Sequence, residues 1–129
     1  MIDCVFCHVD LESTQKVIFT NDHCMFLQLD TSSNIGSTLK GAGVIVPKIH
    51  RETVFDLTED EWNAMYELLQ EVKAYLDAKH QPDGYNLGWN SGAVGGQHIS
   101  HAHFHILPRY RDEPLAGKGI RYMFKDVNK

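Results

Sequence analysis

Residues 101–107 read His-Ala-His-Phe-His-Ile-Leu, an alternation of histidine with apolar side chains. A period of two is typical of a β-strand, in which successive side chains point to opposite faces. We expect a strand over 99–108, with Gln97 in the same parity as the histidines and the apolar residues turned into a core. The histidine face consists of His101, His103 and His105.

A long helix is predicted after Thr58, which forms a capping box with Glu61 three residues later. The helix is expected to end near Lys79 and His80, before a Gln-Pro-Asp-Gly turn. Its apolar stripe at helical spacing comprises Trp62, Met65, Leu69, Val72 and Leu76.

Further strands are expected over 17–20, 24–29, 44–46 and 85–89, and a polar, glycine-containing loop over 30–43. Strands, one helix and then strands again predict an α+β fold with an antiparallel sheet. No linker divides the chain, so we expect a single domain over 1–129.

Composition excludes several function classes. The net charge of −5 argues against a surface that tracks nucleic acid, so no nucleic-acid partner is expected. No apolar run approaches the roughly 20 residues that span a bilayer, so no membrane partner is expected either. Three cysteines and no recognisable leader pattern favour a reducing compartment, and we predict a cytoplasmic protein.

The histidine strand has two interpretations from its residues alone. An arbitrary His-x-His-x-His segment binds metal about as often as not, because imidazole is a common metal ligand. Gly92, Gly95 and Gly96 precede this segment and would let backbone N–H groups approach an anion, which favours chemistry on a phosphate.

Residues 101–107 resemble the signature of the histidine triad (HIT) family. Its flanks are also similar to the family: Asn90 and Gly92 before Gly96-Gln97, Pro108-Arg109 after the triad, and Val44 to His50 before the long helix. The resemblance covers about 4–109 and leaves a tail over 110–129. It implies the HIT-like fold, a five-stranded antiparallel sheet with one long helix and a short N-terminal helix.

The resemblance also implies a nucleotidyl hydrolase. The substrate would be a nucleoside polyphosphate, dinucleoside polyphosphate or nucleoside phosphoramidate, cleaved at its α-phosphate through a nucleotidyl-histidine intermediate. His103 would be the nucleophile, its Nδ1–H held by a backbone carbonyl near His101. His105 would donate to a phosphate oxygen, and Gln97 would hold the leaving-group side.

The implied partner is a purine nucleotide. Apolar positions of the nucleoside site match Val5, Phe6, Val9 and Phe26, and the ribose-binding position falls at Gln28. The phosphate loop contributes Asn90, Gly96 and His98. The chain departs from the family where Ala42 replaces a histidine and where His98 replaces a hydroxyl residue.

Cys4 and Cys7 have metal-ligand spacing, but one such pair is half a zinc site. The family resemblance implies that His50 and His101 are the other two ligands of this zinc site. Four protein ligands leave no open position, so the zinc would be structural, and catalysis would require no cofactor.

Two rival functions and two further expectations remain from the sequence. The chain could be a non-catalytic nucleotide-binding regulator or a histidine-rich metal-binding protein, whereas a nucleotidyl transferase is less expected because His105 is retained. The loop at 111–121 either folds over substrate phosphates or is a solvated tail. The resemblance implies a homodimer, supported by Tyr66, Leu68 and Tyr75 lying off the helix stripe.

Overall fold

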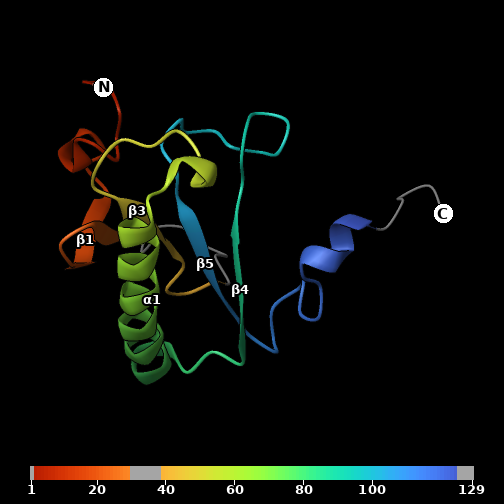
Figure 1. The fold of residues 1–129 in the computed structure, drawn as a ribbon. Helices are drawn as coiled ribbons and strands as arrows, with labels where there is room; N and C mark the ends of the chain where they lie inside the picture. The colour runs from red at the N-terminus through yellow and green to blue at the C-terminus, as the bar shows by residue number, and fades with distance from the viewer. Residues whose placement is uncertain (1, 30–38, 125–129) are drawn as a thin grey trace.

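A computed structural model describes residues 2–29 and 39–124 (Figure 1). One long helix, α1 (Glu59–His80), packs on a single antiparallel sheet whose strand order is β1-β2-β3-β5-β4. The strands are β1 (Gln15–Thr20), β2 (Cys24–Leu29), β3 (Gly43–Pro47), β4 (Gly84–Trp89) and β5 (Phe104–Arg109). Three short 3-10 helices are η1 (Val9–Leu11), η2 (Val54–Asp56) and η3 (Ile120–Phe124). The expected α+β fold is confirmed.

The β1–β2 hairpin is closed by one side chain at its turn. Asn21 Oδ1 accepts hydrogen bonds from the backbone N–H groups of His23 and Cys24 at 3.1 and 2.9 Å. Its Nδ2 donates to the carbonyl of Ala64 in α1 at 2.8 Å. The same residue therefore makes the turn and ties the hairpin to the helix. Of the loop expected over 30–43, residues 30–38 lie outside the described part of the chain.

Helix α1 begins where the capping box predicts. The Thr58 side chain accepts from the Glu61 N–H at 3.1 Å, and the Glu61 carboxylate accepts from the Thr58 N–H at 2.8 Å. The helix ends at His80, after which Gln81 adopts a left-handed conformation with φ 53°. Both ends were thus readable from local sequence.

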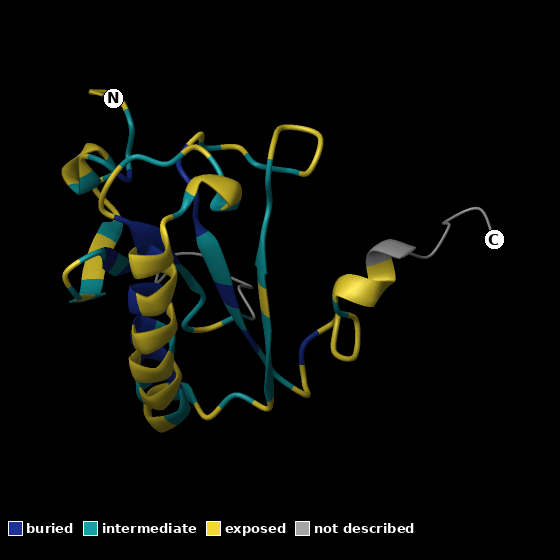
Figure 2. Cartoon of the chain, in the orientation of Figure 1, coloured by how far each residue is buried: buried dark blue, intermediate teal, exposed yellow. Residues whose placement is uncertain are grey.

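The buried stripe of α1 differs from the predicted one. Leu68, expected off the stripe, is fully buried, whereas Trp62 is 45% exposed. The buried apolar residues are Ala64, Met65, Leu68, Val72 and Leu76, at spacings of one, three and four. Figure 2 shows this face of α1 turned to the sheet and the opposite face exposed. Trp62 instead meets Trp89 of β4 edge-on, with ring centroids 5.7 Å apart.

Strand β5 begins at Phe104, five residues later than expected. Its partner β3 pairs only with residues 104–106. Ahead of that, the Ala102 N–H donates to the carbonyl of Arg51 at 2.7 Å, so it is not part of a strand ladder. Of the three histidines predicted on one strand face, only His105 therefore lies within β5.

The two faces of the sheet have different cores. On the α1 face, Cys24, Phe26, Ile45 and Ile106 join the buried stripe of the helix. On the other face, Leu27 and Val46 pack with Phe6 from the N-terminal segment. No helix within 2–29 or 39–124 is long and apolar enough to cross a membrane.

Candidate active site and metal centre

A cavity of about 400 Å³ lies on the sheet face away from α1. Strands β2, β3 and β5 form its floor, and the N-terminal segment forms one wall. It is lined by Val5, Phe6, Glu12, Gln15, Leu27, Gln28, Leu29, Ala42, Gly43, Val44, Ile99, His103, His105 and Leu107. An apolar cavity with a few polar groups in its lining is the usual form of a small-molecule site.

His103 is oriented by the backbone just before it. Its Nδ1 lies 2.9 Å from the carbonyl oxygen of His101, and a carbonyl can only accept. Nδ1 therefore carries the proton in the neutral ring, and Nε2 keeps its lone pair. The ring is 7% exposed and lies against Phe6, with centroids 5.2 Å apart. This is the arrangement expected of an imidazole nucleophile.

His105 lies beside His103 and also lines the cavity. The two ring centroids are 4.8 Å apart. Burial, together with the neighbouring His103, lowers the pKa of His105 below its ordinary value. Its Nε2 is buried without a hydrogen-bond partner in the described structure. A buried polar atom of this kind favours a ligand with which it can bond.

His101 does not line the cavity, although the sequence placed it on the same strand face. It is fully buried, and its Nε2 donates to the carbonyl of Pro47 at 2.8 Å. Because Nε2 carries the proton, Nδ1 offers a lone pair in the opposite direction. That nitrogen points into a cluster with Cys4, Cys7 and His50.

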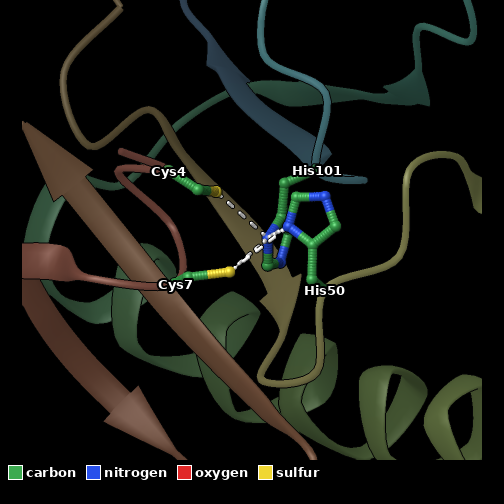
Figure 3. Close-up of side chains that lie close together, drawn as sticks. All are labelled: Cys4, Cys7, His50 and His101. Atoms are coloured by element: carbon green, nitrogen blue, oxygen red, sulfur yellow. Dashed lines mark hydrogen bonds between the residues drawn. The ribbon is translucent and has the colours of Figure 1, made fainter. Parts of the chain in front are cut away.

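The cluster brings together four ligand atoms, all within 4.8 Å of one another (Figure 3). His101 Nδ1 lies 3.2 Å from His50 Nδ1 and 3.5 Å from the Sγ atoms of both Cys4 and Cys7. Cys7 Sγ lies 3.3 Å from His50 Nδ1. The cluster thus presents two thiol sulfurs and two imidazole nitrogens at one point.

These separations fit a tetrahedral metal site. Zn–N bonds of about 2.0 Å and Zn–S bonds of about 2.3 Å make tetrahedral edges of about 3.3 Å between two nitrogens and about 3.5 Å between nitrogen and sulfur. Each of the four measured distances lies close to one of those edges. The donor set, two cysteines and two histidines, is also a usual zinc set. The four residues could therefore hold a metal ion.

The phosphate-loop residues expected from the sequence do not line the cavity. Gln97 accepts from the Gly92 N–H at 2.8 Å and donates to the carbonyls of Glu52 and Ile99 at 2.6 and 2.9 Å. Both polar atoms of the Gln97 amide are therefore used in hydrogen bonds that hold the glycine-rich loop in place.

The other three residues expected at the phosphate loop, Asn90, Gly96 and His98, lie near Gln97 in the sequence. Asn90 Nδ2 lies 3.5 Å from the carbonyl of Gly96. Gly96 has φ +96°, a conformation that favours glycine. His98 is exposed.

Phe26 is placed differently from the sequence expectation. It is fully buried in the core against α1, and its ring would lie 2.8 Å from a Cβ atom at Gly43. It therefore does not reach the cavity. Gln28 borders the cavity, but its Nε2 donates to the carbonyl of Gly41 at 2.9 Å. Val9 packs on the Phe6 cluster without lining the cavity.

Sequence reasoning missed several cavity residues. Leu27 and Leu29 lie on the strand face opposite Phe26, and they line the cavity in place of Phe26. Glu12, a half-buried lining residue, accepts from the Thr14 hydroxyl at 2.8 Å, and this bond lowers the pKa of its carboxyl group. Parity with Leu27 could have identified Leu29, but nothing in the periodicity identifies Glu12.

Comparisons with other proteins agree with this geometry. The HIT domain family model matches residues 10–112. An uncharacterized HIT-like protein of Methanocaldococcus jannaschii is 33% identical over 114 residues, covering 85% of this chain and 81% of that protein. The adenosine 5'-monophosphoramidase of Schizosaccharomyces pombe is 26% identical, covering 92% of this chain and 83% of that protein. The adenylylsulfatase of Arabidopsis thaliana is 32% identical, covering 92% of this chain and 59% of that protein.

Solved structures show the same fold. A HIT family protein from Bacillus anthracis superposes with a TM-score of 0.72 at 28% identity, covering 86% of this chain and 76% of that one. A zinc-bound histidine triad family protein from Mycobacterium smegmatis superposes with a TM-score of 0.70 at 21% identity, covering 92% of this chain and 83% of that one. With its matching residues, sheet order and paired histidines, the chain belongs to the HIT family.

Proposed function

We propose that this protein is a nucleotide hydrolase that cleaves its substrate at the α-phosphate through a nucleotidyl intermediate on His103. One observation carries the proposal: His103 Nδ1 donates to the His101 carbonyl, which leaves Nε2 with a free lone pair on a residue that lines an apolar cavity. The relatives named for adenosine monophosphoramidase and adenylylsulfatase activity support the same class of reaction.

The reaction balances with the groups that surround the cavity. His103 Nε2 attacks the α-phosphorus, an N–P bond forms, and the P–O or P–N bond to the leaving group breaks. A nitrogen leaving group takes up one proton from solvent as it departs, and the attacking water returns one proton in the second step. His105 donates an N–H to a non-bridging oxygen as its charge grows. Water then attacks phosphorus and breaks the N–P bond, which releases the nucleoside monophosphate and restores the imidazole.

The apolar walls suit a nucleoside, and we extend the proposal to a purine base. A cavity of about 400 Å³ with Phe6 and Leu27 on its walls is large enough to enclose a small organic group. Phe6 already lies against the His103 ring, so a bound base would complete a continuous apolar surface beside the reacting phosphate.

We further propose zinc as the metal held by Cys4, Cys7, His50 and His101. The zinc-bound relative from Mycobacterium smegmatis supports this choice, as do the four ligand-atom separations that match tetrahedral edges. A zinc ion with four protein ligands supplies structural cross-linking rather than a reactive water. It would tie the N-terminal segment to the residue whose carbonyl orients His103.

A homodimer is also proposed. Strand β4 is an edge of the sheet, and unpaired edges are usually covered or paired. Trp62 and Tyr66, 45% and 65% exposed, lie on α1, and Trp62 reaches β4 through Trp89. Light scattering at micromolar concentration should give about 29 kDa, twice the chain mass of 14.7 kDa. A particle of the chain mass would contradict the dimer without affecting His103.

The hydrolase proposal is tested with a substrate panel. Adenosine and guanosine phosphoramidates, dinucleoside polyphosphates and matching pyrimidine compounds are incubated with the wild type and with His103→Ala. We expect release of nucleoside monophosphate by the wild type only, with purine compounds preferred. Nucleotide binding with no turnover of any compound would indicate a binding regulator instead.

A further inference from the structure

A second cavity, of about 580 Å³, lies between β4 and the C-terminal segment. It is lined by Asn86, Ala116, Gly117, Lys118, Gly119, Ile120, Arg121 and Tyr122. Figure 1 shows the segment that ends in η3 beyond β4, on the side of that strand away from α1. We call this space the C-terminal cavity.

The strand register places the C-terminal cavity next to the active-site histidines. Gly88 of β4 pairs with His105 of β5, and Asn86 pairs with Leu107. Directly paired residues of antiparallel strands point to the same face of a sheet. His105 and Leu107 line the nucleoside cavity, so Asn86 lies on that same face, one strand farther toward the edge.

The C-terminal segment contacts this face directly. A Cβ atom at Gly119 would lie 3.1 Å from Asn86 Nδ2, and a Cβ atom at Gly88 would lie 3.9 Å from Ile120 Cδ1. Because Gly88 has no side chain, the surface between His105 and the C-terminal cavity carries no bulky group from β4. The Ile120 side chain contacts β4 at Gly88, so a substrate with its phosphorus beside His105 would extend across β4 past this side chain.

The segment is held in place by Arg109. Its guanidinium donates to the carbonyls of Leu115 and Lys118 at 2.5 and 2.6 Å, and also to Asn86 Oδ1. Glu113, 7% exposed, pairs with the same guanidinium at 2.6 Å. The charge of Arg109 is thus balanced, and its hydrogen bonds are used to shape the loop.

Lys118 and Arg121 supply the positive charge of the C-terminal cavity. No carboxylate is among its lining residues. Lys118 Nζ lies 5.0 Å from the ring centroid of Tyr122, which leaves its ammonium group able to donate to an anion. Two cations and an asparagine amide without a facing carboxylate match the oxygens of phosphate groups.

We propose that the C-terminal cavity is a subsite for the anionic leaving group, the phosphate chain beyond the scissile bond. The inference rests on the proposed function, because it takes the α-phosphate to lie at His103 and His105. Substrates that leave as a polyphosphate or a phosphorylated nucleoside would contact Lys118 and Arg121. A small leaving group such as ammonia would not reach them.

The test compares two double variants of the full chain that lose the same charge. Lys118→Ala/Arg121→Ala removes both cations of the subsite, and Lys73→Ala/Lys79→Ala removes two exposed cations from α1, on the opposite sheet face. Binding of inorganic tripolyphosphate is measured by calorimetry. KM is measured for diadenosine tetraphosphate and for adenosine 5'-monophosphoramidate.

We expect the subsite variant to bind tripolyphosphate at least about 10-fold more weakly, as loss of two charge-assisted contacts predicts. Its KM for diadenosine tetraphosphate should rise by a similar factor, with less than about a 2-fold change for the phosphoramidate. Equal tripolyphosphate binding by both double variants, or equal KM changes for both substrates, would overturn the subsite. If the wild type turned over neither nucleotide, the hydrolase proposal would fail, and the tripolyphosphate measurement would still decide the subsite.

Discussion

His103 takes its orientation from the backbone carbonyl of His101, at 2.9 Å, while the His101 ring belongs to the cysteine–histidine cluster. The residue that orients the proposed nucleophile is therefore itself part of the candidate metal site. His101 and His103, two positions apart in the chain, connect the candidate metal site to the cavity.

The first prediction concerns the metal. Protein purified without added metal should contain close to one zinc per chain by elemental analysis. Cys4→Ser/Cys7→Ser should lose the zinc and melt at a lower temperature, because metal binding that accompanies folding contributes to the free energy of unfolding. Activity should fall as well, since the carbonyl of His101 is no longer held.

Cys24→Ala is the matched control for the metal. Cys24 is buried against α1, far from the cluster in sequence, and its Sγ contacts the carbonyl of Glu61. This variant should keep its zinc even if its stability changes. Several exchangeable ions per wild-type chain would favour the histidine-rich metal-binding function. A wild-type protein that contains no zinc would contradict the four-ligand zinc site.

The second prediction separates the two sheet faces. Phe6→Ala removes a wall of the nucleoside cavity, so KM for a nucleotide should rise several-fold. Phe26→Ala should reduce the free energy of unfolding by about 3–5 kcal/mol, as is usual for a buried phenylalanine, with little change in KM. Denaturant unfolding and steady-state kinetics on both variants give the comparison. A larger KM change for Phe26→Ala than for Phe6→Ala would show that the face assignment is wrong.

The third prediction concerns Glu61 and Arg51, which connect α1 to the segment just before His103. Arg51 Nε lies 3.1 and 3.2 Å from the two carboxylate oxygens of Glu61, and the Arg51 carbonyl accepts from the Ala102 N–H. Burial opposes the charge of Glu61, but hydrogen bonds from Thr58 and Arg51 outweigh it and lower the pKa of this carboxyl group.

A lowered pKa fixes the sign of the pH effect. The ionised Glu61 adds stability that is fully present above the unfolded pKa of about 4.3 and is lost as the pH falls through the lower, folded pKa. Glu61→Gln should therefore cost about 1–3 kcal/mol at pH 7, and its melting curve should approach that of the wild type in acid. Glu59→Gln, an exposed change in the same helical turn, is the control. A pH-independent difference between Glu61→Gln and the wild type would contradict this account.

Local signals in the sequence predicted α1 and the strands well. The capping box at Thr58 placed the helix start because both of its hydrogen bonds form within four residues. The hairpin strands and β4 were also readable from their own residues. The features that the sequence did not predict depend on contacts between distant residues. One is the start of β5, because the Ala102 N–H donates to the carbonyl of Arg51 instead of a neighbouring strand.

The candidate site was only partly readable for a similar reason. Residues 24–29 are mostly apolar on both faces, so alternation alone could not decide whether Phe26 or Leu27 faces the cavity. The resemblance named Cys4, Cys7, His50 and His101 as one group, and the structure brings these four residues together. The sequence placed His101 on the same strand face as His103. In the structure β5 begins only at Phe104, so the ring of His101 lies in the cluster and not in the cavity, and no local pattern predicts this.

Trapping the nucleotidyl intermediate tests the central role of His103 most directly. The wild type is mixed with an adenosine phosphoramidate or diadenosine polyphosphate, quenched at early times and digested for mass spectrometry. We predict an adenylyl adduct on His103, and a loss of kcat by several orders of magnitude in His103→Ala with nucleotide binding retained. An adduct on another residue, or more than about a tenth of the activity in His103→Ala, would contradict the covalent mechanism.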